Sequence, residues 1–139
     1  MTFNLNIIYY IKIYLVSLIF FLGIDIIWLT KVAPGFYKSN IGHLMAEKPN
    51  LWAAVAFYLF NLIGIIIFAV SPSLKNNSLR SAIILGALYG FFTYATYDLT
   101  NYATLKNWPI TVVIIDILWR MILTSVVSLI TYLIGIKYL

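Results

Sequence analysis

The stretch 51-LWAAVAFYLFNLIGIIIFAV-70 contains no Asp, Glu, Lys or Arg over 20 consecutive residues. A bilayer core is about 30 Å thick and takes about 20 helical residues, because lipid offers no partners for free backbone groups. This stretch therefore predicts a helix that crosses a membrane. Three other predominantly apolar stretches meet the same length, and the four expected helices cover residues 7–29, 51–70, 79–99 and 109–136.

The composition of the whole chain agrees with these spans. Hydrophobic residues make up 63% of the 139 positions and charged residues 9%, against roughly 45–50% and about 25% in soluble domains. We therefore expect an all-α, polytopic membrane protein, in which residues 1–139 form a single four-transmembrane-helix bundle. The net charge of +5 is too sparsely distributed for a phosphate-binding face, so nucleic acid is not an expected partner.

Metal-centred chemistry is largely excluded by composition. The chain has no Cys and a single His, so thiolate zinc sites, iron–sulfur clusters and His clusters within the chain are ruled out. We expect no metal and no cofactor.

Prolines and polar residues punctuate the connections between the spans. Pro34-Gly35 and Pro49-Asn50 fall in the first connection, Ser71-Pro72-Ser73 in the second and Asn107-Trp108-Pro109 in the third. The first span is longer than the apolar region of a signal peptide and lacks a small-residue cleavage site, so we interpret it as a membrane helix. The aromatic residues between positions 30 and 50 predict a short interfacial helix there.

The acidic residues are expected in one half of the membrane. In an antiparallel bundle, Asp25 near the end of the first helix, Asp98 at the end of the third and Asp116 near the start of the fourth lie on the side opposite the N-terminus. Ionisable groups at membrane depth are costly and usually face the bundle interior, which makes them functional candidates. We expect Asp25 and Asp116 to face each other, with Asp98 near the mouth of the same cluster.

Arg120 is expected to be the deepest cation. It stands four residues after Asp116, so the two side chains share a helix face and are predicted to pair, with Asp25 as a second carboxylate. This pair either fixes the packing or takes part in binding a ligand, and the sequence leaves both open.

A short pattern, Asp-x-x-Trp, occurs twice. Asp25-Ile26-Ile27-Trp28 and Asp116-Ile117-Leu118-Trp119 both place a carboxylate and an indole on one helix face. The carboxylate is then positioned to accept a hydrogen bond from the indole N–H or from a ligand beside the ring.

The third span ends in a segment rich in hydroxyl and amide groups. Thr93, Tyr97, Thr100 and Thr104 recur at helical spacing, beside a stripe of Tyr94, Asp98 and Asn101. Such groups are poorly placed against lipid, so we expect them to line a wet cavity or an interhelical hydrogen-bond seam. Asn61, halfway along the second span, is a candidate partner across the bundle. The candidate ligand-binding residues are Asp25, Trp28, Asn61, Tyr94, Tyr97, Asp98, Asn101, Asp116, Trp119 and Arg120.

Small residues mark one expected close contact between helices. Ala82, Gly86 and Gly90 follow one another at intervals of four residues in the third span. Such a stripe lets another helix approach closely. We interpret it as packing within this chain rather than as a dimer interface.

The stretch 89-YGFFTYATYDLTNYATLKNWP-109 resembles the signature of a bacterial membrane family known as domain of unknown function 2177. The segments 25–29 and 116–119 and the pair Phe36-Tyr37 are similar to other signature positions of that family. The resemblance covers nearly the whole chain and implies a small four-helix inner-membrane protein without an established activity. One departure concerns Arg120, which stands where the family usually has Gly.

Three functions remain open at this stage. A cavity lined by Asp, Trp and Tyr favours binding or transport of a small amphiphilic or cationic ligand. An accessory or assembly subunit of a membrane complex is the second candidate, and a lipid-modifying membrane enzyme is the third. Membrane lipid, a homo-oligomer or another membrane protein are the expected partners, and the sequence does not decide whether the chain is an enzyme.

Orientation rests on the basic residues near the ends of the spans. Four lie on the N-terminal side and four on the opposite side, so the positive-inside count is tied. We favour cytoplasmic N- and C-termini in a bacterial inner membrane, because the free N-terminus adds one charge to that side. The counted residues are Lys12, Lys75, Arg80 and Lys137, against Lys31, Lys38, Lys48 and Lys106.

Overall fold

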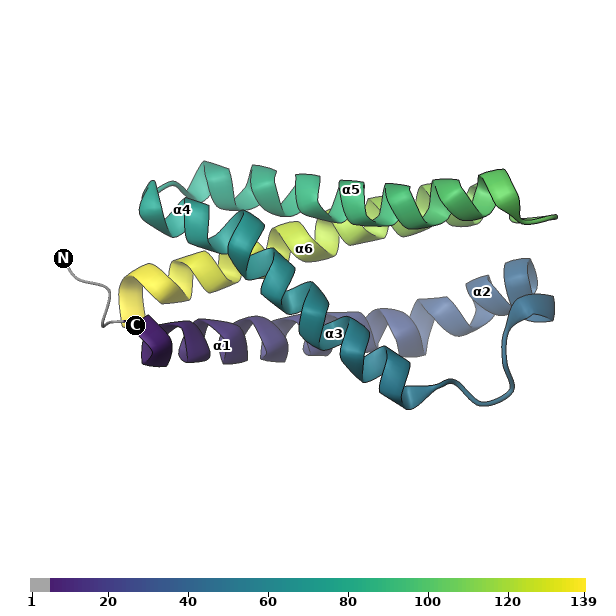
Figure 1. The fold of residues 1–139 in the computed structure, drawn as a ribbon, viewed down its shortest axis with the longest axis horizontal. Helices are drawn as coiled ribbons and strands as arrows, with labels where there is room; N and C mark the ends of the chain where they lie inside the picture. Colours follow the sequence, from purple (N-terminus) through teal and green to yellow (C-terminus); the bar gives the residue numbers. More distant parts are fainter. Residues whose placement is uncertain (1–5) are drawn as a thin grey trace.

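A computed structural model describes residues 6–139 of the chain, and within this range it contains helices, turns and no strand. The start of α1 and the end of α6 lie at the same end of an elongated bundle (Figure 1). We refer to this end as the termini end, and to the other as the α2 end. The elements are α1 (Asn6–Ile27), η2 (Trp28–Val32), α2 (Ala33–Ile41), η3 (Gly42–Leu44), α3 (Leu51–Ile65), η4 (Ile66–Val70), α4 (Ser71–Lys75), α5 (Leu79–Thr104) and α6 (Ile110–Tyr138).

The expected fold class is confirmed. Four continuous helical segments in the described range are long and apolar enough to cross a membrane. Three of them extend well past the expected ends. The α1 helix continues through η2 into α2, α3 continues through η4 into α4, and α5 runs on to Thr104. The four segments are Ile7–Leu44, Leu51–Lys75, Leu79–Thr104 and Ile110–Tyr138.

Prolines do not end the first and second helices, although the sequence indicated boundaries at both. Pro34 and Pro72 each follow a π-helical turn, in which the Ala33 N–H bonds to the Trp28 carbonyl and the Ser71 N–H to the Ile66 carbonyl. In a regular α-helix the proline ring collides with the carbonyl four residues earlier. The wider π turn relieves this collision, so the helix continues and only changes its pitch.

Helices α5 and α6 form the closest pair in the bundle. A methyl group added to Gly86 would lie 2.7 Å from the Thr124 carbonyl oxygen, and one added to Gly90 would collide with the Arg120 carbonyl oxygen. Thr124 donates across the contact to the Gly86 carbonyl at 2.6 Å. The prediction that the small-residue stripe packs within the chain is therefore confirmed.

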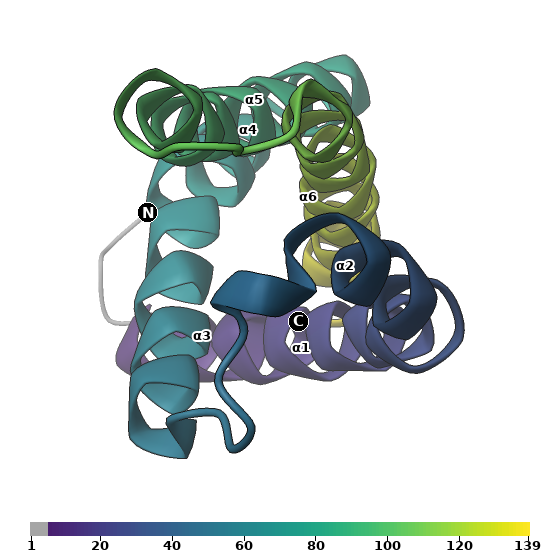
Figure 2. The ribbon, with the colours of Figure 1, turned by 90° about the vertical axis from the view of Figure 1, so that its right-hand side faces the viewer.

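The four spans enclose a common interior (Figure 2), but α3 departs from this arrangement. Its second half packs with η4 into the core, while its first half diverges from α5 toward the α2 end (Figure 1). The core at the termini end is formed by the buried side chains of Ile13, Phe21, Leu62, Ile65, Ile66, Val70, Leu123 and Val127.

Candidate ligand cavity

The interior widens at the α2 end into a cavity of about 840 Å³. All four spans contribute to its wall, because α3 diverges from α5 and the extended α1–α2 segment lies over the start of α6. The lining residues are Trp28, Leu29, Tyr37, Ile41, Phe57, Phe60, Asn61, Tyr89, Thr93, Tyr94, Tyr97, Trp108, Asp116, Trp119 and Arg120. Seven of the ten candidate residues are in this wall, and Asp25, Asp98 and Asn101 are not.

Asp25 lies directly behind the cavity wall and is completely buried. Its carboxylate accepts a hydrogen bond from the Tyr58 hydroxyl at 2.8 Å and another from the Trp119 indole N–H at 3.3 Å. Arg120 Nη2 lies 3.8 Å from the same carboxylate. Both oxygens of Asp25 are thus occupied by groups from α3 and α6, so this carboxylate holds three spans together.

The predicted pairing of Arg120 with Asp116 is wrong, whereas the expected contact with Asp25 as a second carboxylate is confirmed. The ion pair that Arg120 forms within the described residues is with Asp25 on α1. Its guanidinium lies 4.3 Å from the Tyr94 ring centroid, and 5.5 Å from those of Phe21 and Phe57. These rings position the guanidinium across the bundle, where cation–π attraction and the Asp25 charge outweigh the pairing along one helix.

Asp116 has a different partner, which the sequence did not indicate. The Tyr37 hydroxyl of α2 donates a hydrogen bond to Asp116 Oδ1. Tyr37 reaches this position because the helix continues through Pro34 and packs its aromatic face on the start of α6. The boundary expected at Pro34 concealed this contact.

The two Asp-x-x-Trp segments contact each other. The Trp28 and Trp119 rings stack with centroids 4.4 Å apart and planes 9° from parallel. Trp119 donates to Asp25, the carboxylate of the other segment, rather than to the Asp of its own segment. The repeated pattern therefore links α1 to α6 and gives the cavity an aromatic wall.

Asn61 is the polar group of α3 that faces the interior, and its side chain is 8% exposed. The Tyr89 hydroxyl donates to the Asn61 backbone carbonyl at 3.2 Å. This hydroxyl occupies the space next to Gly64, where any side chain would collide with it. The side-chain nitrogen of Asn61 has no acceptor among the described residues.

Asp98 is buried beside the cavity, with neither carboxyl oxygen in a hydrogen bond within the described range. Asp116 and the Trp108 indole are its polar neighbours. Tyr97, one residue earlier, is half-exposed at the rim of the cavity and packs edge-on against Trp108. Asn101 is half-buried outside the wall.

The hydroxyl-rich segment divides between two faces of α5. Thr93 lies in the cavity wall as expected. The expectation is wrong for Thr100 and Thr104, which are exposed on the outer face. Each donates to the carbonyl four residues earlier, at 2.5 and 2.8 Å. A threonine can satisfy its hydroxyl on its own helix, so it does not require a polar neighbour.

Several residues of the wall were not candidates from the sequence. Tyr58 could have been found, because it precedes Asn61 by three residues and so shares its helix face. The other aromatic residues gave no such signal, since a ring in an apolar span is as common against lipid as in an interior. The additional aromatic residues are Tyr37, Phe57, Phe60, Tyr89 and Trp108 in the wall and Tyr58 behind it.

These features define a helical membrane protein with four spans and an aromatic cavity between them. The chain belongs to the family described as "Predicted membrane protein (DUF2177)", which matches residues 10–133. The family suggested by segment 89–109 is therefore confirmed. No curated protein and no solved structure matches the chain.

Proposed function

We propose that this protein binds a small amphiphilic molecule inside the membrane, in the cavity at the α2 end. The observation that carries this proposal is a cavity of about 840 Å³ lined by aromatic rings and a few buried polar groups. Small-molecule sites have volumes of roughly 300–1,000 Å³ and this mixture of lining residues. If the helices at the α2 end were there only to pack against one another, side chains would fill the space between them, as they fill the interior at the termini end.

The rim of the cavity favours access from the lipid phase. Phe60 on α3 is 73% exposed and Tyr97 on α5 is 51% exposed, yet both line the cavity. Their exposed surfaces lie in membrane-spanning helices, and the first half of α3 diverges from α5 between them (Figure 1). A molecule dissolved in the bilayer can therefore reach the cavity laterally.

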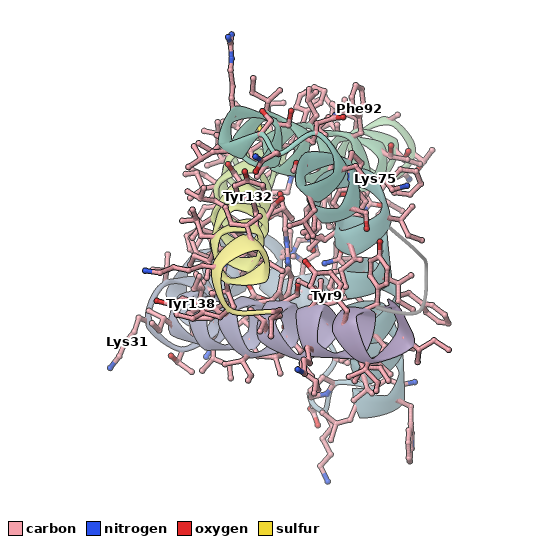
Figure 3. The ribbon with its side chains drawn as sticks, turned by 90° about the vertical axis from the view of Figure 1, so that its left-hand side faces the viewer. Tyr9, Lys31, Lys75, Phe92, Tyr132 and Tyr138 are labelled. Atoms are coloured by element: carbon pink, nitrogen blue, oxygen red, sulfur yellow. The ribbon has the colours of Figure 1, made fainter. Side chains whose placement is uncertain are left out.

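Binding is favoured over passage through the monomer. At the termini end the interior is filled by aliphatic side chains such as Ile13, Leu62 and Val127. Tyr9 also points into the space between the helices at this end, and its hydroxyl donates a hydrogen bond to the Gly135 carbonyl. Lys31, by contrast, points away from the bundle (Figure 3). This end offers no continuation of the cavity among the residues described.

Native mass spectrometry of protein purified in mild detergent tests the proposal. We expect one small-molecule adduct per chain, and we expect it to be lost in Thr93→Phe, which fills the cavity wall. Thr100→Phe is the matched control, because Thr100 is on the same helix with the same internal hydrogen bond but faces outward. An adduct retained in Thr93→Phe, or a second polypeptide in place of a small molecule, contradicts the proposal.

We also propose a bacterial inner-membrane location with both termini in the cytoplasm. The even number of spans in the described range supports placing the start of α1 and the end of α6 on the same side of the membrane, which we propose is the cytoplasmic one. The cavity then opens toward the outer leaflet. Reporters active only in the cytoplasm or only in the periplasm, fused after Leu139, test this orientation. Activity of the periplasmic reporter overturns it.

A further inference from the structure

The polar groups in the cavity wall without partners are hydrogen-bond donors. Arg120 and Asn61 both line the cavity and are 9% and 8% exposed. The Arg120 Nε and Nη1 atoms and the Asn61 side-chain nitrogen have no acceptor among the described residues. A buried donor left without an acceptor is destabilising, and more so when it is charged.

The carboxylates nearest these donors are already occupied. Asp25 accepts from Tyr58 and Trp119 and lies next to Arg120, while Asp116 accepts from Tyr37. The distance of 3.8 Å from Arg120 Nη2 to Asp25 is an ion-pair contact that is longer than a hydrogen bond. The buried atoms of the wall without a partner among the described residues are therefore donors, and a complementary ligand supplies acceptor oxygens.

The aromatic rings around Arg120 favour a negatively charged ligand. Its guanidinium lies against the faces of Tyr94, Phe21 and Phe57. These rings fix its plane and exclude water, which strengthens its interaction with an anion. A guanidinium presents its N–H groups as a planar fork that matches the two oxygens of a carboxylate or a phosphate.

We propose that the head group of the bound amphiphile is an oxyanion, a carboxylate or a phosphate, held by Arg120 with Asn61 as a second donor. This inference rests on the proposed function and specifies the ligand's chemical class. It selects the amphiphilic part of the sequence-based expectation over a cationic head group, because Asp25 and Asp116 accept hydrogen bonds from the protein and Asp98 lies outside the cavity wall.

A second groove indicates where the hydrocarbon chain of the ligand lies. A groove of about 580 Å³ runs along the outer face of α5 beside Phe68 of η4. Tyr89 and Thr93 line both the groove and the cavity, so the two are adjacent. The groove extends toward the bilayer centre past Leu88 and Phe92, which are exposed to lipid. The chain of an amphiphile whose head lies at Arg120 thus leaves the cavity along this groove.

The experiment compares four amphiphiles with the same 12-carbon chain: dodecanoate, dodecyl phosphate, dodecyltrimethylammonium and 1-dodecanol. Binding to the purified protein in lipid nanodiscs is measured by competition with a fluorescent fatty-acid probe. We expect saturable binding of both oxyanions, at least about tenfold tighter than that of the other two compounds. The ratio between dodecanoate and dodecyl phosphate then identifies which oxyanion the site prefers.

Three variants test the residues. Asn61→Leu keeps the size of the side chain and is expected to weaken oxyanion binding several-fold, with dodecanol unchanged. Asp25→Asn combined with Arg120→Gln removes both charges of the ion pair and is expected to abolish the preference for oxyanions. Thr100→Phe is the control expected to bind like the unmodified protein. Circular dichroism and gel filtration establish that each variant is folded.

The outcomes separate the two proposals. If dodecyltrimethylammonium binds more tightly than the oxyanions, the proposal of an oxyanion head group is wrong. The same holds if all four compounds bind equally and Thr93→Phe abolishes their binding. In both cases the proposed binding of an amphiphile still stands. A preference for oxyanions that survives both Asn61→Leu and the charge-removed double variant also overturns the role of these residues. If none of the four compounds binds saturably, both proposals fall.

Discussion

The termini end and the α2 end of this bundle are built from the same four spans, but they differ in how closely the helices approach. At the termini end, aliphatic side chains fill the interior, and Ser17 and Thr131 form a buried hydrogen bond of 3.1 Å. At the α2 end, large aromatic side chains and the Asp25–Arg120 pair hold the helices around a cavity.

This difference shows how side-chain size and polarity place a site in a membrane bundle. Apolar side chains gain nothing by leaving lipid for another apolar surface, so close packing and hydrogen bonds decide where helices touch. Glycines bring α5 and α6 together, whereas rings on α3 and α5 hold those helices apart. The buried charged side chains of Asp25, Asp116 and Arg120 then lie at the end where the helices are held apart, where they bind one another, a tyrosine hydroxyl or a ligand.

The largest expected effect concerns the α2 end. Asp25→Ala leaves Arg120 buried without its carboxylate and removes the acceptor of Tyr58 and Trp119. We expect a loss of about 3–5 kcal/mol in unfolding free energy. Asp116→Ala removes only the acceptor of Tyr37 and should cost less. Thermal unfolding of both variants in one detergent measures the difference, and a larger loss for Asp116→Ala would restore the pairing predicted from the sequence.

A smaller effect is expected where α5 meets α6. Gly90→Ala places a methyl group against the Arg120 backbone, which must shift. We expect a loss of about 1–3 kcal/mol. Gly23→Ala is the matched control, since a methyl group there has no neighbour within 4 Å, and it should cost nothing. Equal stability of the two variants in a denaturant titration would show that α5 and α6 are not in close contact.

The polar contact of the termini end is expected to contribute less. Ser17→Ala removes the hydrogen bond to Thr131 and should lower the unfolding free energy by about 1 kcal/mol, the typical value of one such bond. Ser39→Ala is the control, because the Ser39 hydroxyl is exposed and bonds to the Phe36 carbonyl of its own helix. A loss as large as that of Asp25→Ala would mean that both ends depend equally on polar contacts.

The smallest effect is expected on the outer face of α5. Thr100→Val removes a hydroxyl that bonds only to its own helix, and the change in stability should stay within about 0.5 kcal/mol. Thr124→Val, by contrast, removes the buried bond to Gly86 on α5. If unfolding shows the two variants to be equally destabilised, Thr100 has a partner on another chain.

Much of the fold was predictable from local patterns, but the contacts of the site were not. The existence of four spans follows from apolar length, and the α5–α6 contact from three small residues at one spacing. Pro34 and Pro72 misled the prediction of helix ends, because a π turn accommodates a proline only when tertiary packing favours continuation. Tyr37 was missed as a partner of Asp116 for that reason.

The sequence by itself determined that the described part of the chain has four helices able to cross a membrane and that the three Asp residues lie inside the bundle, because lipid excludes charges and free backbone groups regardless of packing. Only the tertiary structure decided which groups pair. Asp116 lies four residues before Arg120 on the same helix, but Arg120 forms its ion pair with Asp25 on α1, because Tyr94, Phe21 and Phe57 surround its guanidinium. The partner of Arg120 depends on where three other helices place their side chains, and the spacing of residues along one helix does not predict this.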